Sequence, residues 1–458
     1  MKKRLSQHQI EYVLEHLGHH ASISPELRRL FLYGTTPEPG VPQVYFPLSE
    51  EALDPGQMIR IDDIPVLYPV DRSITSFYTF ENNTLLFRHD LLKSVFHLLS
   101  GYEEYKSRMS DELGRFPYTA SLQKRLEIVS KPLVNYYFEA ILEGLEVFCK
   151  LNSLPFQRSP VFKNPIFALS HDIDMIDAYH FFETGYKFKM LLKLVPSPYS
   201  RTDTWRVAFS SLYHFLNPFS RKNPFWNFDF LMKSEADRGF RSSFYFLEKD
   251  GIHDNSRYQF RTKRIREMMN RLSEKGFEVG IHGTVQSATD QEAMNRTVAN
   301  LRQAAPAKVE GIRQHYLKYR LPQTAQIQQK AGLNYDTTLG FAEHEGFRNS
   351  YCWPFKLYDF ENNQALDLWQ IPLTMMDVTM FGYRKMDFEQ IHLSIQELVR
   401  EVQKFNGIFS MLWHNSFFDE YEHPGITSFY LDQLDYIRSM KLEGITGREI
   451  AGRMPVAN

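Results

Sequence analysis

An apolar run over Ile166–Leu169 ends abruptly in the sequence Ser-His-Asp-Ile-Asp. The run is typical of a buried strand. If the chain stays extended beyond it, Ser170, Asp172 and Asp174 point to one side and His171 to the other. Two carboxylates on one face repel each other unless a cation or a shared proton relieves them. The spacing therefore predicts a metal site or an acid–base pair, since an Asp that caps the next helix would explain only one of the two.

Further short apolar runs also end in side chains that could take part in catalysis. Each of these residues alone is weak evidence for an active site. A lone histidine at a strand end is more often structural, and a lone arginine often forms a surface ion pair. In parallel α/β folds, however, the carboxyl ends of the strands meet at one edge. We therefore expect these residues to converge with the Asp pair in one pocket. They are His282, Arg313 and His414.

Short apolar strands alternate with helical patterns from Pro165 onward. This alternation indicates a parallel α/β sheet or an imperfect barrel. Residues 178–226 interrupt it with aromatic and basic residues, and we interpret them as a helical insertion over the mouth of the barrel, a lid or substrate wall. The predicted strands cover 166–169, 242–246, 278–281, 308–312, 333–335, 368–372 and 407–413. The predicted helices cover 227–238, 261–275, 290–304, 322–331, 387–405 and 428–440.

The first part of the chain, residues 1–155, has a different texture and no cluster of catalytic residue types. We expect it to be a smaller α+β domain ahead of a barrel domain over residues 156–458, because 458 residues exceed one ordinary domain. Helices are predicted over 5–17, 25–33, 90–108 and 131–152, with a strand pair over 58–61 and 65–69. The sequence itself does not indicate what this domain does.

Composition excludes several classes of function. Lys and Arg number 53 against 55 acidic residues, which gives a net charge of −2 and no basic footprint for nucleic acid or a polybasic membrane patch. No apolar stretch approaches the roughly 18 residues that a transmembrane helix needs. Only Cys149 and Cys352 are present, so no disulfide framework is implied. A cytoplasmic protein is the simplest expectation, and its oligomeric state stays open.

Several motifs, taken in order, resemble those of the polysaccharide deacetylases (carbohydrate esterase family four). Ser-His-Asp-Ile-Asp is similar to the family's first motif in its Asp-x-Asp variant. The resemblance covers about residues 164–450, and residues 1–155 resemble an uncharacterised domain fused ahead of a bacterial branch of the family. The other matching stretches are 311–317, 332–341, 346–348, 371–377 and 412–415, with 96–100, 114–117 and 132–135 in the first domain.

The resemblance implies a deacetylase-type irregular (β/α) barrel and a role for each residue at the strand ends. Asp172 would be the general base and His414 the general acid, while Arg313 would keep Asp172 ionised and aimed. Asp174 and His282 would hold a divalent metal, which we expect to be zinc. Substrate contacts are expected from four further residues, His315, Tyr316, Asp377 and Trp413.

The chain departs from the family pattern at the third metal ligand. The family has a second histidine four residues after the first, and this chain has Gln286 there. A glutamine amide is a neutral and weaker ligand, and zinc prefers nitrogen and sulfur. Three interpretations stay open: Gln286 ligates weakly, water completes the shell, or the site is no longer a hydrolase. Residues that could substitute for the missing histidine are Asp177, His180 and His315.

The sequence therefore favours a metal-dependent hydrolase that removes an N-acetyl group from a sugar or glycan precursor. A nucleotide- or lipid-linked precursor of surface polysaccharide fits a cytoplasmic protein. The alternative from another class is a carbohydrate-binding or scaffold protein that keeps the barrel and has lost the metal, which Gln286 favours. A third possibility is a metal-assisted amidohydrolase that acts on a non-sugar amide.

Overall fold

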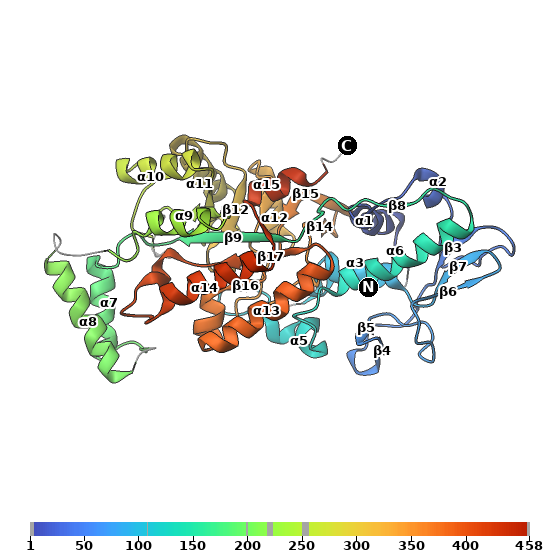
Figure 1. The fold of residues 1–458 in the computed structure, drawn as a ribbon, viewed down its shortest axis with the longest axis horizontal. Helices are drawn as coiled ribbons and strands as arrows, with labels where there is room; N and C mark the ends of the chain where they lie inside the picture. Colours follow the sequence, from blue (N-terminus) through green and yellow to red (C-terminus); the bar gives the residue numbers. More distant parts are fainter. Residues whose placement is uncertain (1–3, 108, 198–199, 218–222, 250–255, 456–458) are drawn as a thin grey trace.

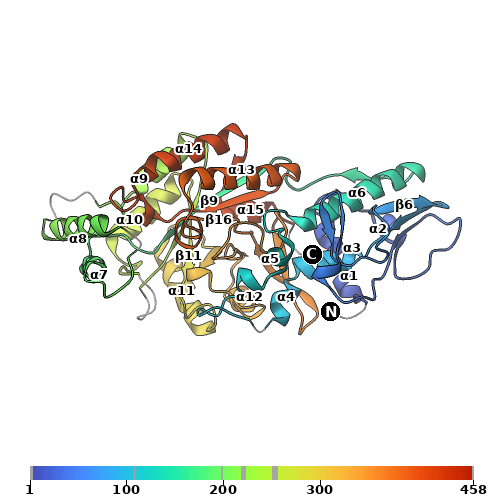
Figure 2. The same cartoon turned by 90° about the horizontal axis from the view of Figure 1, so that it is seen from below.

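The computed structural model describes residues 4–107, 109–197, 200–217, 223–249 and 256–455. A curled α/β sheet forms its centre, the N-terminal part lies at one end, and a helical hairpin lies at the other (Figure 1 and Figure 2). The strand order is β14-β15-β13-β12-β11-β10-β9-β17-β16, with β18 paired to β9. Every strand pair is parallel except β14 with β15. The predicted α/β barrel class is confirmed, in the form of an open, curled sheet.

The strands of this sheet are short, and the longest, β9, runs through its middle. Their bounds are β9 (Ile166–Ile173), β10 (Ser243–Phe246), β11 (Glu278–Gly283), β12 (Gly311–Gln314), β13 (Tyr335–Asp336), β14 (Phe355–Asp359), β15 (Gln364–Gln370), β16 (Met375–Met376), β17 (Ile408–Leu412) and β18 (Glu443–Gly444). β9 is buried along its whole length. β14, β16 and β18 were not predicted, because two of them have two residues each and β14 pairs antiparallel at the edge of the sheet.

Amphipathic helices pack against the sheet. α13 shows why: its buried residues Ile391, Ile395, Leu398 and Val402 recur every three or four positions, which places them on one face. An Asp387–Gln390 capping box fixes where this helix begins. The helices after β9 are α9 (Phe228–Ala236), α10 (Lys263–Glu274), α11 (Gln291–Ala304), α12 (Gln323–Lys330), α13 (Phe388–Lys404), α14 (Ile426–Ser439) and α15 (Gly447–Arg453).

The N-terminal part combines a four-stranded sheet with helices, as predicted for a smaller α+β unit. Its sheet has the order β2-β3-β7-β6, and β4 pairs with β5. Its elements are α1 (Gln7–Leu17), β1 (Ala21–Ser22), α2 (Pro25–Arg28), β2 (Phe31–Tyr33), β3 (Gln43–Phe46), β4 (Ile59–Ile61), β5 (Ile64–Val66), β6 (Tyr78–Glu81), β7 (Thr84–Phe87), α3 (Leu91–Leu99), α4 (Tyr102–Lys106), α5 (Leu122–Leu126), α6 (Leu133–Leu151) and β8 (Gln157–Arg158).

Two helices predicted for this part are shorter than expected. The helix over 25–33 ends at Arg28, and Phe31–Tyr33 pairs as a strand with β3. The helix over 90–108 breaks at Gly101, whose φ of 70° is left-handed; residue 108 lies outside the described residues. A side chain at Gly101 would meet Leu321 of the barrel, since an added Cβ would lie 2.6 Å from its Cδ1 atom. Glycine therefore permits close packing between the two parts.

The N-terminal part and the barrel share one continuous hydrophobic core. Polar contacts also cross between them: the Tyr12 hydroxyl donates to the Lys356 carbonyl at 2.6 Å, and the Lys356 amide donates to His16 Nε2 at 3.1 Å. The boundary near residue 155 stays a prediction, and among the described residues one hydrophobic cluster extends across both parts.

The insertion predicted over 178–226 contains two helices in the part that the structure describes. α7 (Phe181–Leu191) and α8 (Arg201–Leu216) form a hairpin whose helices pack chiefly against each other. The hairpin stands away from the sheet (Figure 1). Its role as a lid stays a prediction. None of the described helices combines the length and apolarity that crossing a bilayer requires.

Candidate metal centre and active site

The buried ion pair between Asp172 and Arg313 lies where β9 and β12 end. Arg313 Nη1 donates to Asp172 Oδ1 at 3.0 Å and to the Ser170 hydroxyl at 2.8 Å, and both charged residues are almost fully buried. His171 points to the other side of β9, where its Nε2 lies 2.8 Å from Glu235. The alternation predicted for residues 170–174 is therefore confirmed. Because its Oδ1 is held by Arg313, the carboxylate of Asp172 has a fixed orientation.

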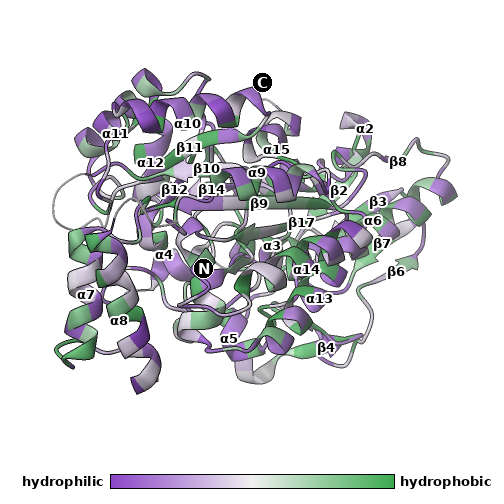
Figure 3. Ribbon diagram, turned by 60° about the vertical axis from the view of Figure 1, so that its left-hand side comes forward, coloured by the Kyte–Doolittle hydropathy of each residue, from purple (hydrophilic) through white to green (hydrophobic). Residues whose placement is uncertain are grey.

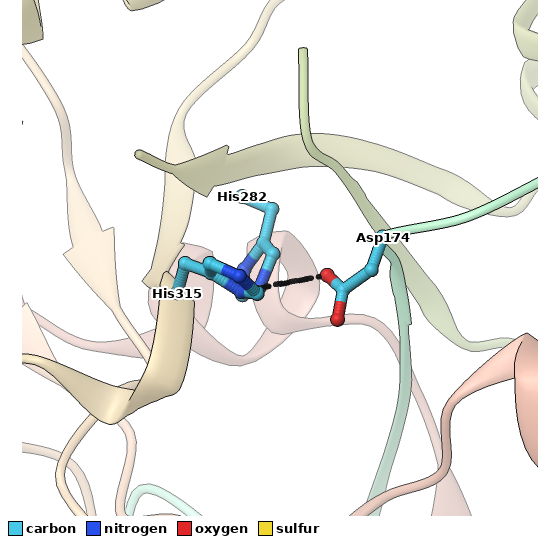
Figure 4. Close-up of side chains that lie close together, drawn as sticks. All are labelled: Asp174, His282 and His315. Atoms are coloured by element: carbon cyan, nitrogen blue, oxygen red, sulfur yellow. Dashed lines mark hydrogen bonds and ion pairs between the residues drawn. The ribbon is translucent and has the colours of Figure 1, made fainter. Parts of the chain in front are cut away.

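Asp174, His282 and His315 form a compact cluster beside this pair (Figure 4). They come from the ends of three strands: Asp174 directly follows β9, His282 lies in β11, and His315 directly follows β12. One ligand atom from each lies within 4.8 Å of the others. His282 Nε2 is 3.1 Å from His315 Nδ1 and 3.2 Å from Asp174 Oδ1, and the His315–Asp174 distance is 3.6 Å. Each residue thus directs an oxygen or nitrogen toward one point.

The chemistry of this donor set fits a divalent metal. His282 Nδ1 lies 2.9 Å from the Arg313 carbonyl, to which it donates, so its Nε2 lone pair faces the cluster. Atoms bound tetrahedrally to zinc at roughly 2.0–2.1 Å lie about 3.4 Å apart, close to the distances within the cluster. Asp174 Oδ1 is buried and accepts no hydrogen bond from a described residue. A buried oxygen in this state is expected where a cation normally satisfies it.

Burial and neighbouring charges set the ionisation of the cluster. Burial raises the pKa of Asp174, but His315, His282 and His414 outweigh it and hold that pKa below its usual range. Burial lowers the pKa of His315 to about 4 against the opposing charges of Asp174 and Asp172, whereas the same two carboxylates raise the pKa of His282 despite its burial. A carboxylate beside a neutral imidazole is the state that binds a metal ion.

His414 faces the cluster from the end of β17 and is held by Asp377. Its Nδ1 lies 2.7 Å from Asp377 Oδ1, its main-chain amide donates to Asp377 Oδ2 at 2.5 Å, and its Nε2 lies 3.9 Å from Asp174. Burial opposes protonation of His414, but Asp377, Asp174 and Asp172 outweigh it and raise its pKa to about 10. The imidazolium therefore has a proton on Nε2 that it can donate.

Three other predicted site residues, Gln286, Asp377 and Trp413, lie outside the ligand cluster. Gln286 is exposed in the turn after β11, where its side chain bonds to Asp290, so it is not brought to the cluster. Asp377 is fully buried behind His414 and positions that residue instead of facing a substrate. Trp413 is also fully buried, with its ring 5.3 Å from that of Tyr430, so it contributes to the core and not to the ligand cluster.

Tyr316 is the one predicted substrate contact that is partly exposed beside the cluster. Its ring lies 3.8 Å from the His315 ring, and its φ of 58° is left-handed, which turns the chain sharply after β12. A contact with substrate at Tyr316 stays a prediction. His315, expected to touch substrate or to replace a ligand, lies in the ligand cluster.

Two features of the site were not predicted. Asp377 as the partner of His414 had no sequence signal, since the two lie 37 positions apart and only the pairing of β16 with β17 brings them together. Arg115, from the N-terminal part, reaches the turn after His315 and donates to the Tyr316 carbonyl at 2.7 Å. The Gly-Arg-Phe-Pro motif at 114–117 was the only available signal.

Comparison with known proteins gives matches to each part of the chain. Residues 6–149 match a family described as a family of unknown function (DUF7033). No curated protein matches the chain. A solved structure from Mycobacterium smegmatis, assigned as a polysaccharide deacetylase, is 13% identical and has a TM-score of 0.42; the match covers 65% of this chain and 92% of that one.

Two further solved structures are similar at lower scores. The peptidoglycan deacetylase PdaC from Bacillus subtilis, solved as a point mutant, is 11% identical with a TM-score of 0.29, covering 64% of this chain and 92% of that one. A CE4 family pseudoenzyme from Bacillus anthracis is 8% identical with a TM-score of 0.33, covering 64% and 68%.

Proposed function

We propose that the chain is a metal-dependent hydrolase that removes the N-acetyl group from an amino sugar. The observation that carries this proposal is the meeting of three distinct groups at one edge of the sheet. A ligand cluster (Asp174, His282 and His315), a carboxylate held by an arginine, and a histidine held by a carboxylate lie together. Metal-assisted amide hydrolysis needs a metal site, a base and an acid together, whereas a binding pocket needs neither base nor acid.

The residues of the cluster would hold a divalent ion, for which zinc fits the two nitrogens and one oxygen. When bound, such an ion polarises a carbonyl group and lowers the pKa of water. We assign the third ligand to His315, because its Nδ1 is 3.1 Å from His282 Nε2 while Gln286 is exposed elsewhere. This assignment removes the main reason to interpret the site as inactive.

The base in this proposal is Asp172 and the acid is His414. Asp172 Oδ2 is the oxygen not bonded to Arg313 and lies 3.6 Å from His282 Nε2, so it can take a proton from water beside the cluster. The water oxygen bonds to the acetamide carbon, the C–N bond breaks, and His414 Nε2 gives its proton to the leaving nitrogen. Acetate and a free amine are the products, and Asp377 keeps the imidazole of His414 oriented throughout.

The proposed substrate is an N-acetylated sugar or glycan precursor, such as a nucleotide- or lipid-linked intermediate of surface polysaccharide in the cytoplasm. Tyr316 supports this choice, because a partly exposed aromatic ring at the rim of a site suits the apolar face of a sugar. Acetate release should be measured on free N-acetyl sugars, their nucleotide conjugates, a lipid-linked N-acetyl sugar and a simple non-sugar acetamide. Release from the sugars supports the proposal; release only from the acetamide would assign another amidohydrolase.

Metal content and two variants complete the test. The purified protein should hold close to one equivalent of zinc or another divalent ion by elemental analysis. Asp172→Asn should abolish acetate release with metal content and thermal unfolding unchanged, while Asp71→Asn, at an exposed loop position, should behave as wild type. Sugar binding without metal or acetate release would instead identify a carbohydrate-binding protein on the same fold.

A further inference from the structure

The α7–α8 hairpin buries mostly small or polar side chains, together with Met190 and Val207, and leaves most of its large apolar side chains exposed. Between the helices, the buried Thr184 and Ser211 hydroxyls hydrogen bond at 2.9 Å, and Ala208 is fully buried. A helix pair in a soluble domain normally buries its apolar stripe. Many residues of the hairpin are hydrophobic (Figure 3), and its large apolar side chains stay substantially exposed, although the Arg257 guanidinium lies over the Phe182 ring.

The exposed apolar side chains of the described residues are concentrated here. Ten of the nineteen large hydrophobic residues that are substantially exposed belong to this 36-residue hairpin. Soluble monomers rarely expose large apolar patches, and those they expose commonly mark a protein or membrane contact. Ring contacts join the helices: Phe181 lies 6.2 Å from Phe215, and Phe188 lies 5.8 Å from Phe209. The most exposed are Phe181, Phe182, Leu192, Leu194, Tyr213 and Leu216, at 57–70%.

The hairpin is also positively charged, although the whole chain is not. Residues 181–216 contain five Lys or Arg and two Asp or Glu, a net charge of +3 in a chain with a net charge of −2. Lys187 is used internally, since its ammonium lies 2.5 Å from Glu422. Lys189, Lys193, Arg201 and Arg206 are exposed beside the apolar side chains. The net charge of the whole chain does not reflect this local excess.

We infer that the hairpin is a peripheral membrane-binding element, which inserts its exposed aromatic and leucine side chains into a bilayer surface that contains anionic lipid. Aromatic, leucine and basic side chains together are typical of helices that lie in the interface. α7 has 11 residues and α8 has 16, shorter than the roughly 20 needed to cross the hydrocarbon layer. The apolar side chains project from a protruding hairpin instead of lining a groove, which suits a lipid surface better than a folded partner.

The position of the hairpin relates this surface to the candidate site. α7 begins seven positions after Asp174, and the Lys187–Glu422 ion pair joins it to the segment that follows β17 and His414. A membrane beneath the hairpin would therefore lie on the side of the sheet where the site opens. If the chain is the proposed hydrolase, this position of the membrane favours a lipid-linked sugar substrate over a nucleotide-linked one; this step rests on the proposed function.

Vesicle flotation of the full chain tests the membrane contact directly. Vesicles of phosphatidylcholine alone should leave most of the protein unbound, and vesicles with equal parts phosphatidylglycerol should carry it to the top of the gradient. Replacing Phe181, Leu194 and Trp205 with serine should reduce the bound fraction at least tenfold. The matched control replaces Val70, Leu151 and Leu393, which are similarly exposed outside the hairpin, and should bind as wild type.

Charge variants give a second measurement that leaves the apolar face intact. Lys189→Glu with Lys193→Glu should abolish flotation with anionic vesicles, whereas Lys150→Glu with Lys275→Glu, also exposed, should not. Asp174→Asn should float as wild type, so that loss of hydrolysis and loss of membrane binding are separate results. The proposal is overturned if wild type stays unbound, if the hairpin and control variants bind equally, or if the hairpin instead forms a dimer by light scattering without binding vesicles.

Discussion

The guanidinium of Arg115 donates a hydrogen bond of 2.7 Å to the main-chain carbonyl of Tyr316, which joins the N-terminal part to the turn that carries His315. Arg115 is nearly buried, and its Nε donates to Asp111 at 2.6 Å. Tyr316 and Leu317 both have left-handed φ angles, of 58° and 53°, which cost about 1–2 kcal/mol per residue. Arg115 thus stabilises a strained turn from outside the barrel.

The first prediction is that Arg115→Ala weakens metal binding. Without the guanidinium the turn can relax, and His315 loses its orientation toward His282. Groups that orient metal ligands typically contribute roughly 10–100-fold in affinity, so we expect about a tenfold weaker zinc affinity by competition with a chelator. The control is Arg72→Ala, which removes an exposed ion pair with Glu51 in the N-terminal part and should leave the zinc affinity unchanged. Equal affinities would show that the turn is stable by itself.

The local sequence pattern was sufficient to predict how the site residues within β9 are oriented. An apolar strand alternates its side chains, so the orientations of Ser170, His171 and Asp172 followed from the sequence. The convergence of Asp174, His282, Arg313 and His414 followed from one general rule, that parallel strands place their carboxyl ends together.

The other features of the site could not be predicted, because they depend on three-dimensional geometry that the sequence pattern does not determine. His315 reaches the cluster because the chain turns left-handed at the next residue, and no motif encodes that turn. Trp413 adjoins His414 but points into the core, because neighbouring residues at a strand end face opposite ways. The sequence shows that the α7–α8 hairpin is rich in aromatic and basic residues, but it does not show which of these side chains are exposed; only the structure does.

The second prediction separates His315 from Gln286 as the third ligand. His315→Ala should remove a ligand and lower the bound metal severalfold by elemental analysis, because two protein ligands hold zinc weakly. Gln286→Ala should retain the wild-type metal content, since this side chain is exposed and bonds to Asp290. Gln286→His should likewise leave the metal content close to that of the wild type. Loss of metal from Gln286→Ala with retention in His315→Ala would reverse the assignment.

The third prediction concerns stability and pH in the N-terminal part. Asp90 is fully buried, and burial raises its pKa to about 6 despite bonds from the Ser49 and Lys93 amides and the Tyr33 hydroxyl. The folded protein therefore binds this proton more tightly than the unfolded chain. Its contribution to stability is complete below pH 4 and is lost as the pH rises through about 6, by about 3 kcal/mol.

Denaturant unfolding between pH 4 and 7 measures this effect against Asp90→Asn, which cannot titrate. The free energy of unfolding of the wild type should fall relative to that of the variant as the pH rises, whatever the absolute cost of the substitution. Lys93, whose own pKa is lowered by burial, interacts electrostatically with Asp90 and is present in both proteins. Parallel curves would show that Asp90 keeps an ordinary pKa.

The fourth prediction is that Asp377 acts through His414. Asp377→Asn keeps the shape of the side chain but removes the charge that stabilises the imidazolium, so it should lower kcat on the order of 100-fold, within the range for general acid catalysis. KM and metal content should not change, because Asp377 is fully buried behind His414 and is not a ligand in the cluster. His414→Ala should have at least as large an effect on kcat.

The double variant decides between a positioning role and a merely structural one. If Asp377 works only by orienting His414, then adding Asp377→Asn to His414→Ala should cause no further loss of kcat, since the group it orients is already gone. A further loss of similar size in the double variant, or a fall in thermal stability that tracks the loss of activity, would show that Asp377 supports the fold of the β16–β17 region. Coincident kcat values for His414→Ala and the double variant would establish that the two residues act as one unit.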